Sequence, residues 1–275
     1  MGESRKCQVL VIGAGPGGYV AGIRSAQLGL DTIIVEGDKA GGTCLIRGCI
    51  PSKAIIHAAE RFESLRQHSA DGGHMGLSVN GEAKVDMVEL VSWKDSIVDR
   101  LNKGVEGLLK AAGAELIKGW ASFDGPKSCT VDTGAGSLKI EAENVIIATG
   151  SSHIDLPFMP CDEEFVISST GALDLESLPK SVAIVGGGYI GLELGCALAK
   201  LGSEITVVEG MSSVLAIMDK EIRRPLEMWL KKHKVTVHTD SLARGVEIKG
   251  RGASKKAELT FEKGGTEHKV KVDKV

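Results

Sequence analysis

The stretch Gln8-Val9-Leu10-Val11-Ile12-Gly13-Ala14-Gly15-Pro16-Gly17-Gly18 decides the fold of this chain. Its apolar half, rich in Val and Ile, predicts a buried parallel strand. Its glycine-rich half predicts a tight turn into a helix, in which Gly13 and Gly15 let a pyrophosphate approach the backbone and Gly18 lets the helix pack closely on the strand. The N–H groups and the dipole at such a helix N-terminus favour anions, so this turn predicts a dinucleotide site.

The residues after the turn complete the unit. A helical stretch to about Leu28 leads to a second apolar strand over 32–35, and Glu36 follows 23 residues after Gly13. An acid at this distance suits the ribose hydroxyls of a dinucleotide. A glycine pattern alone is a weak signal, but strand, turn, helix, strand and acid together predict nucleotide binding. The predicted binding residues are Gly13, Gly15, Pro16, Gly17, Gly18 and Glu36.

The same unit recurs 173 residues later in the chain. A second glycine run follows another apolar run, and Glu209 again stands 23 residues after the first glycine, Gly186. The segments 26–29 and 199–202 overlay at this offset. A repeat of a whole domain predicts two bound dinucleotides, most simply a flavin and a nicotinamide. The predicted residues of the second site are Gly186, Gly188, Tyr189, Ile190, Gly191 and Glu209.

Two cysteines five residues apart, Cys44 and Cys49, stand in the stretch Gly41-Gly42-Thr43-Cys44-Leu45-Ile46-Arg47-Gly48-Cys49-Ile50-Pro51-Ser52-Lys53. The other four cysteines are scattered and are interpreted as ordinary core or surface residues. A close pair in a cytosolic protein is more often catalytic or metal-binding than structural. A zinc half-site and an inert bridge are the alternatives, although no second Cys/His pair stands at zinc-ligand spacing.

This stretch resembles the redox-disulfide motif of the flavoprotein disulfide reductases, and its Ile-Pro-Ser-Lys ending is similar to that of the dihydrolipoamide dehydrogenases. The resemblance covers essentially the whole chain and implies a Cys44–Cys49 disulfide. A bridge requires the loop to curl, which Gly48 permits. Pro51 suits the first turn of a following helix, and the N-terminus of that helix would lower the pKa of Cys49. Cys44, expected further out, is the predicted exchange thiol.

The resemblance also implies roles for residues outside the cysteine pair. The lysine that Lys53 matches lies near the flavin and pairs with a glutamate on the first helix of the second domain, which Glu193 matches here. On spacing alone, a solvated surface lysine and an ordinary helix residue are the alternatives. The resemblance adds to the cofactor-binding residues Gly42, Thr43, Ala121, Ala148, Thr149 and Gly150, the last three as the Ala-Thr-Gly that closes such FAD domains.

Two sequence details refine the resemblance. Glu209, followed by Met211-Ser212-Ser213, favours NAD over NADP, because an acid repels a 2′-phosphate and no Arg is placed to receive one. Members usually carry Asn two residues after the first cysteine, whereas this chain has Ile46 and then Arg47. With Trp93-Lys94-Asp95 and Gly119-Trp120-Ala121, this departure is similar to the variant that serves branched-chain 2-oxo acid complexes.

We predict an α/β protein with two tandem Rossmann-like domains, each with a β-meander. The FAD-binding domain with the redox disulfide spans residues 1–153 and the NAD-binding domain spans 154–275, next to a Pro-bearing linker over 156–160. The remaining patterns predict helices over 55–67, 86–112 and 219–233 and strands over 115–118, 144–150 and 235–238. Val275 stands about where Val145 stands in the first half, so we expect the native polypeptide to continue with a returning strand.

Composition limits the alternatives. The 275 residues carry a net charge of −3 with no long basic run, which gives no case for nucleic acid or an anionic membrane. No apolar run reaches the roughly 18–20 residues that span a bilayer. The first residues leave no room for a signal or transit segment, so we predict a cytoplasmic protein.

The function predicted by the resemblance is oxidation of dihydrolipoamide to lipoamide with FAD and NAD. The implied partner is a lipoyl domain of a 2-oxo acid dehydrogenase complex or the glycine cleavage carrier protein, and the full-length form is a homodimer. Its C-terminal dimerisation domain carries a His-Glu pair that none of the seven histidines matches, including His57 and His68. This chain alone is therefore expected to complete the cycle poorly. The alternatives are a related reductase of another disulfide or of mercuric ion, and a non-catalytic FAD- and NAD-binding fragment.

Overall fold

The computed structural model describes residues 3–69 and 74–275, which form two compact units. One unit comprises the chain up to Pro51 together with Asp95–Ser152, and the other comprises Ser52–Lys94 together with His153–Val275. The break at Ser152 lies next to the predicted domain boundary, while residues 52–94, assigned to the first domain by sequence, group with the second unit. The domain limits given above stay a prediction. None of the described helices is long and apolar enough to cross a membrane.

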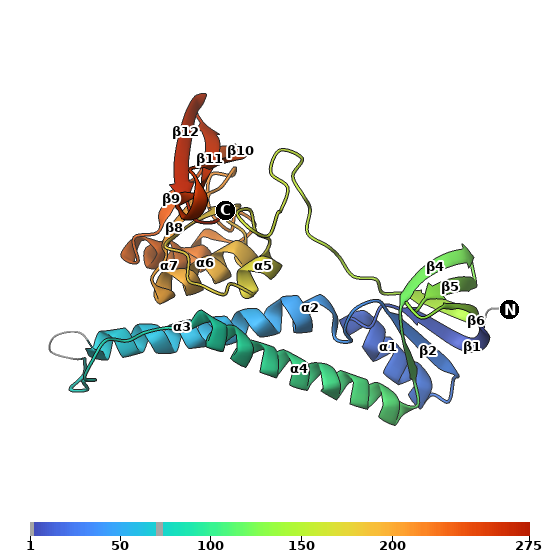
Figure 1. Ribbon diagram of the computed structural model, residues 1–275. Coiled ribbons are helices and arrows are strands. Elements are labelled where there is room, and N and C mark those ends of the chain that lie inside the picture. The colour runs from blue at the N-terminus through green and yellow to red at the C-terminus, as the bar shows by residue number, and fades with distance from the viewer. Residues whose placement is uncertain (1–2, 70–73) are drawn as a thin grey trace. The chain divides into compact units, whose positions relative to one another are not determined.

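The first unit is built on a six-stranded sheet of order β3-β2-β1-β6-β5-β4 (Figure 1). The strands β3, β2, β1 and β6 run parallel, whereas β6, β5 and β4 form an antiparallel meander. The strands span β1 Glu3–Ile12, β2 Thr32–Glu36, β3 Glu115–Lys118, β4 Trp120–Gly125, β5 Ser128–Asp132 and β6 Ser137–Ile147. The helices of this part of the chain are α1 Pro16–Gln27, α2 Gly42–Arg47, α3 Cys49–Ser69 and α4 Met87–Ala112, of which α3 and α4 continue into the second unit.

Successive side chains of β1 point to opposite faces of the first sheet, and both faces are buried. Val9 and Val11 pack with Ile34 and with Leu109 of α4, while Leu10 packs in a separate cluster with residues of the meander. All five side chains are buried. This double burial explains why the strand reads as a continuous apolar run rather than an alternating one.

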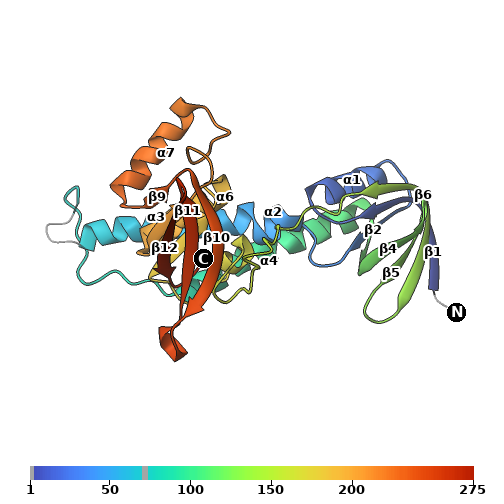
Figure 2. The same cartoon turned by 90° about the horizontal axis from the view of Figure 1, so that it is seen from above.

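The second unit repeats the parallel half of this design. Its sheet order is β7-β8-β9, and an antiparallel meander β10-β11-β12 forms a separate sheet, whose strands lie side by side in Figure 2. The strands span β7 Ser181–Val185, β8 Glu204–Val208, β9 Thr236–His238, β10 Ser241–Lys249, β11 Lys256–Lys263 and β12 Thr266–Val272. The helices are α5 Ser169–Leu173, α6 Tyr189–Leu201, α7 Lys220–Lys232 and the 3₁₀ turn Gly252–Ser254.

The returning strand predicted at the end of the chain begins in the expected register. Val182 pairs with Lys274 in parallel, as Val9 pairs with Asn144 in the first unit. Ala183 N–H donates to Lys274 O at 3.0 Å. Since 182 and 9 are related by the same 173-residue offset as the two glycine turns, Val275 corresponds to Val145. The repeat is therefore one of hydrogen-bond register and not only of sequence.

Three local predictions differ from the structure. The predicted strand 144–150 ends at Ile147, and Ala148 N–H bonds back to Ile12 O at 2.8 Å, so the Ala-Thr-Gly segment is a loop beside the glycine turn. The helix predicted over 55–67 begins earlier, at Cys49. The short helices α2 and α5 were not predicted, since five- and six-residue helices carry too few turns for a periodic pattern.

We predict that Gly18→Ala lowers the free energy of unfolding by about 1–3 kcal/mol, because an added Cβ overpacks a rigid contact. Such an atom would lie 1.8 Å from the backbone oxygen of Gly13, which cannot move aside as a side chain can. Gly17→Ala is the matched control, because the nearest atom to its Cβ would be the Ala148 methyl at 3.9 Å. Urea unfolding measures both variants, and equal stabilities would contradict the packing role of Gly18.

Candidate active site

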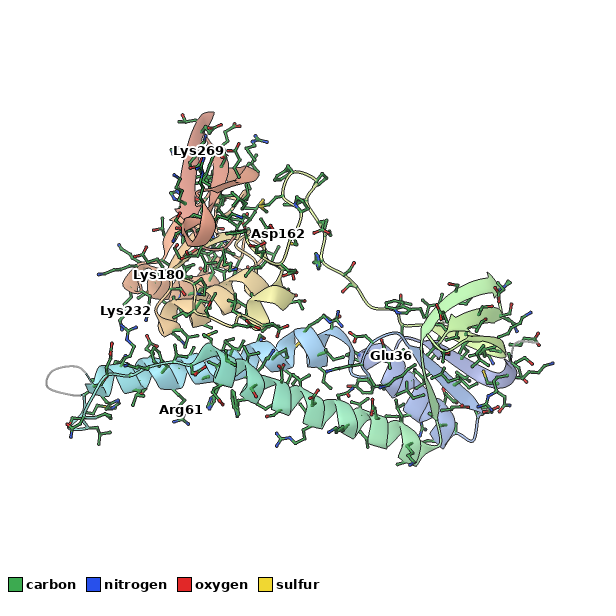
Figure 3. All side chains as sticks on the ribbon, viewed as in Figure 1. Glu36, Arg61, Asp162, Lys180, Lys232 and Lys269 are labelled. Atoms are coloured by element: carbon green, nitrogen blue, oxygen red, sulfur yellow. A yellow bond between two sulfur atoms is a disulfide. The ribbon has the colours of Figure 1, made fainter. Side chains whose placement is uncertain are left out.

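The first glycine turn is held in place by a carboxylate and by its own close contacts. Glu36, labelled in Figure 3 at the end of β2, accepts from Ala14 N at 2.7 Å and from Asp38 N at 2.9 Å. Gly13 has a φ of +97°, and a Cβ there would lie 2.3 Å from Ala148 O. The structure therefore brings the turn, the predicted ribose acid and the Ala-Thr-Gly segment to one place. Thr149 and Gly150 follow directly and are exposed.

The loop that carries the cysteines packs directly on this turn. Gly41 N–H donates to Ala14 O at 2.8 Å. A Cβ on Gly42, whose φ is +67°, would lie 2.5 Å from the Cα of Gly15. The two backbones thus approach with only glycine hydrogens between them, which explains why both predicted residues are glycines. Pro16 is the first residue of α1, where its missing N–H costs no hydrogen bond.

The cysteines lie at a junction between two helices. Cys44 belongs to α2 and Cys49 is the first residue of α3, and the two form a disulfide with their Cα atoms 4.7 Å apart. Gly48 separates the helices, and a Cβ there would lie 2.8 Å from Thr43 O. Because the two sulfurs are bonded to each other, the pair presents no thiolates for the zinc half-site considered above. The position of Cys49 at the start of a 21-residue helix is the one expected to stabilise a thiolate after reduction.

The exposure of the two cysteines differs from the sequence-based expectation. Cys49 is exposed and Cys44 is half-buried within this structure, whereas Cys44 was predicted to lie further out. Cys44 lies within α2, whereas Cys49 is the first residue of α3. Thr43, also on α2, is exposed.

Burial affects the thiols of two of the other cysteines, Cys7 and Cys196. Burial, with some coulombic help from Asp31, raises the pKa of Cys7 to about 11. Burial also raises the pKa of Cys196 to about 11, against an opposing effect of Lys200. Both thiols are therefore protonated near neutral pH and are poor nucleophiles.

The second glycine turn has the same two backbone hydrogen bonds to a carboxylate as the first. Glu209 accepts from Gly187 N at 2.5 Å and from Met211 N at 2.6 Å, as Glu36 does from Ala14 and Asp38. Gly186 has a φ of +102°, and a Cβ on Gly191 would lie 2.8 Å from Ile184. Helix α6 then begins with Tyr189 and Ile190, both exposed, after Gly188 as its N-cap. The predicted second-site residues thus surround one helix N-terminus.

Lys53 and Glu193 form the ion pair that the resemblance implied. Lys53 Nζ donates to Oε1 and Oε2 of Glu193 at 2.8 and 2.6 Å. Their side chains are 56% and 37% exposed, so the pair is a solvated one and contributes little to stability. Lys53 follows Cys49 by about one turn of α3.

Comparison with known proteins identifies the family. The model of the pyridine nucleotide-disulphide oxidoreductases matches residues 7–275. The chain belongs to the pyridine nucleotide-disulphide oxidoreductase family.

Relatives in this family support the resemblance found in the sequence. The chain is 47% identical over 239 residues to a dihydrolipoyl dehydrogenase from Pseudomonas aeruginosa, covering 86% of this chain and 51% of that protein. It is 41% identical over 268 residues to the dihydrolipoyl dehydrogenase from Geobacillus stearothermophilus, covering 98% and 55%. The chain thus spans about half the length of these curated relatives.

Solved structures agree with the fold. The Cu(II) complex of the HOCl-induced flavoprotein disulfide reductase RclA from Escherichia coli matches with a TM-score of 0.80 at 25% identity, covering 98% of this chain and 55% of that one. The prediction of tandem Rossmann-like domains is therefore confirmed at the level of fold, and family membership implies a flavin and a pyridine nucleotide as cofactors.

Several contacts around this oxidoreductase site were not predicted. Arg47 of α2 forms an ion pair with Asp38, and the buried Asn102 of α4 donates to Ala40 O at 2.6 Å. These contacts fix the loop between Glu36 and the cysteines. Arg47 is a departure from the usual motif, and no spacing rule links Asn102 to the loop. Ala121 lies on β4, pairs with Val131 and packs against the sheet core.

We predict that Gly48→Ala shifts the Cys44–Cys49 equilibrium toward the dithiol about three- to thirtyfold, or about 15–45 mV. The added Cβ would press on Thr43 O and on the Cα of Cys44 at 3.2 Å, and so disfavour the helix junction that the disulfide closes. Thiol quantification in glutathione redox buffers measures the shift. Gly104→Ala, on α4 with no atom within 4 Å of its Cβ, is the control. An unchanged equilibrium in Gly48→Ala would contradict this role of the glycine.

Proposed function

We propose that the native protein is a flavin-dependent dithiol–disulfide oxidoreductase that oxidises protein-bound dihydrolipoamide to lipoamide, with NAD as the acceptor. The observation that carries the proposal is the Cys44–Cys49 disulfide, packed through Gly42 on the dinucleotide turn and placed at the start of α3. The relatives described above are named dihydrolipoyl dehydrogenases, which supports the choice of dihydrolipoamide as the reductant.

The residues at the first turn fit FAD. A Cβ on Gly13 or Gly18 would meet backbone atoms, so these glycines keep the turn tight. The first N–H groups of α1 have no intrahelical acceptor and can bind a pyrophosphate. Glu36 uses its two oxygens on backbone N–H groups, yet a carboxylate has about four acceptor positions and can still receive ribose hydroxyls. The chemistry that FAD supplies when bound is transfer of an electron pair from the reduced cysteines to a nicotinamide.

The second turn fits NAD by the same reasoning. Glu209 follows β8, and its carboxylate accepts hydrogen bonds from Gly187 N and Met211 N. The ribose of a dinucleotide bound at this turn would lie next to this negative charge. A 2′-phosphate would meet this carboxylate, and we infer that NADP is disfavoured. The exposed Tyr189 and Ile190 would border the nucleotide where it meets the N-terminus of α6.

Thiol exchange at the disulfide follows from the positions of the cysteines. A thiolate of dihydrolipoamide attacks Sγ of Cys44, forms a mixed disulfide and expels Cys49 as a thiolate. The N-terminus of α3 stabilises this leaving group, which is why attack at Cys44 is favoured although Cys49 is the more exposed residue. The second lipoyl thiol then attacks the mixed disulfide, which forms the lipoamide disulfide and releases Cys44 as a thiol. Two electrons have then passed to the protein.

Lys53 would assist the reduced state. Its ammonium lies about one helical turn after Cys49 and is oriented by both oxygens of Glu193. A fixed positive charge at this place would favour the negative charge that the reduced protein carries on the Cys49 thiolate. Glu193 is a positioning residue in this account, because its role is exerted through Lys53.

The proposal extends to partners and location. The substrate would be presented by a lipoyl domain of a 2-oxo acid dehydrogenase complex or by the glycine cleavage carrier protein. The native protein would act as a cytoplasmic homodimer, without a nucleic-acid or membrane partner. The similarity of Ile46-Arg47 to the branched-chain variant favours a branched-chain 2-oxo acid complex as the host.

A second candidate is a related reductase whose substrate is another disulfide or mercuric ion. The observation that favours it is the fold similarity to RclA, which is named a flavoprotein disulfide reductase and not a lipoyl dehydrogenase. Both candidates use the same cysteines and differ in the substrate.

The deciding experiment assays the native, flavin-loaded gene product with dihydrolipoamide and NAD, and with glutathione disulfide or mercuric ion and NADH or NADPH. We expect kcat/KM for dihydrolipoamide with NAD to exceed the values for the other two substrates by at least about a hundredfold. NAD is expected to exceed NADP by a similar factor, since like charges meet in the second case. Cys44→Ser should abolish the activity. Preference for glutathione disulfide or mercuric ion would establish the second candidate instead.

A further inference from the structure

Three potential metal ligands of different chemistry come together in the segment 153–161, outside both glycine turns. They are His153, Asp155 and Cys161, and one ligand atom from each lies within 4.8 Å of the others. No other group of three such residues occurs in the part of the chain that the structure describes. All three belong to the second unit, so their geometry is internal to it.

The backbone brings these residues together by a reversal of the chain. Leu156 and Met159 form an antiparallel bridge, in which Met159 N–H donates to Leu156 O at 2.8 Å. Met159 is buried in the cluster that also holds Leu259, and Leu156 and Cys161 pack against that cluster. The reversal places Cys161 N within 3.3 Å of Asp155 Oδ1. The cluster thus rests on core packing and not on surface side chains alone.

The residues after Cys161 restrict it further. The carboxylate of Asp162 accepts from the N–H groups of Glu164, Phe165 and Val166 at 2.8, 2.7 and 2.8 Å. These bonds lower the pKa of Asp162, although its partial burial opposes them. The carboxylate of Asp162 is therefore engaged by the N–H groups of the turn that follows it. The backbone around Cys161 is held by hydrogen bonds both at this residue and directly after it.

We propose that His153, Asp155 and Cys161 bind a zinc ion. Thiolate, imidazole and carboxylate are the ligands that zinc accepts together in tetrahedral sites, whereas calcium and magnesium require oxygen ligands. Tetrahedral zinc places its ligand atoms about 3.3–3.7 Å apart, so side-chain movements of about 1 Å convert the observed spacing into a site. Binding replaces the proton on Cys161 Sγ with the metal and releases that proton to water.

Three protein ligands leave the fourth position open to water. The side chains of His153 and Asp155 are 50% and 58% exposed, and His153 Nε2 lies 3.5 Å from Asp155 Oδ1. A metal ion can therefore enter directly from solvent. Once bound, it would close the loop 153–161, which begins where the first unit ends. This inference goes beyond the dinucleotide and disulfide chemistry and does not depend on it.

The test is equilibrium dialysis of the native, oxidised protein against Zn²⁺, followed by metal analysis. Disulfide-bonded Cys44 and Cys49 cannot compete for the metal in this state. We expect about one zinc per chain, and at least about tenfold weaker binding in Cys161→Ser and in His153→Gln. Cys196→Ser is the matched control, because that half-buried cysteine lies on α6 outside the cluster, and its affinity should stay unchanged.

Cobalt(II) supplies a second readout that folding defects cannot imitate. A thiolate-to-cobalt charge-transfer band should appear in difference spectra of the unsubstituted chain and be absent in Cys161→Ser. Circular dichroism of each variant checks that it is folded. Equal zinc affinity in the unsubstituted chain and in folded Cys161→Ser, or a cobalt spectrum without a thiolate band, would overturn the proposal and leave His153 and Asp155 as an exposed ion pair.

Discussion

The carboxylate at the end of the second strand is the interaction on which the site depends. Glu36 fixes the N–H of Ala14 in the glycine turn, and Gly41 N–H fixes the carbonyl of the same residue. Ala14 is thus held from both sides by the segment that leads to the cysteines. Asp38 extends this network, since its N–H bonds to Glu36 and its carboxylate pairs with Arg47 on α2. The disulfide is therefore placed by the nucleotide turn itself.

The second unit shows which part of this network is general and which is special. Glu209 repeats the two backbone bonds of Glu36, and Val182 repeats the register of Val9 with the returning strand. No cysteine pair follows Glu209 in the chain. The shared bonds shape a dinucleotide turn in both units, whereas the close contact between Gly42 and Gly15 belongs to the unit that carries the redox centre.

Sequence reasoning succeeded where the constraint is local or repeated. Only glycine fits where Gly18 meets Gly13, and the period of apolar residues located the long helices and buried strands. The two halves also served as templates for each other, so analogy with the first half predicted a returning strand near Val275. Family resemblance added the pairing of Lys53 with Glu193, which no spacing rule could give because 140 residues separate them.

Sequence reasoning failed where tertiary contacts decide. Helix α2 is too short for a periodic signal, yet it carries Cys44, which is half-buried while Cys49 is exposed. Pairs such as His233 with Glu63, 2.9 Å apart at the end of α7 and on α3, depend on helix packing. The cluster of His153, Asp155 and Cys161 depends on a chain reversal anchored by the burial of Met159. The residues in each of these features give no structural signal in the sequence by their type alone.

The proposed function requires that Cys49, whose thiolate the start of α3 stabilises, is the cysteine that passes electrons to the flavin. Anaerobic two-electron reduction of the flavin-loaded native protein, followed by absorption spectroscopy, tests it most directly. We predict a long-wavelength charge-transfer band in the unsubstituted protein after reduction. Cys44→Ser has no disulfide to reduce, so it should show the band before reduction, while the flavin is still oxidised, and Cys49→Ser should lack the band in both states. A cysteine-intact, flavin-loaded protein that shows no such band on reduction would contradict the account.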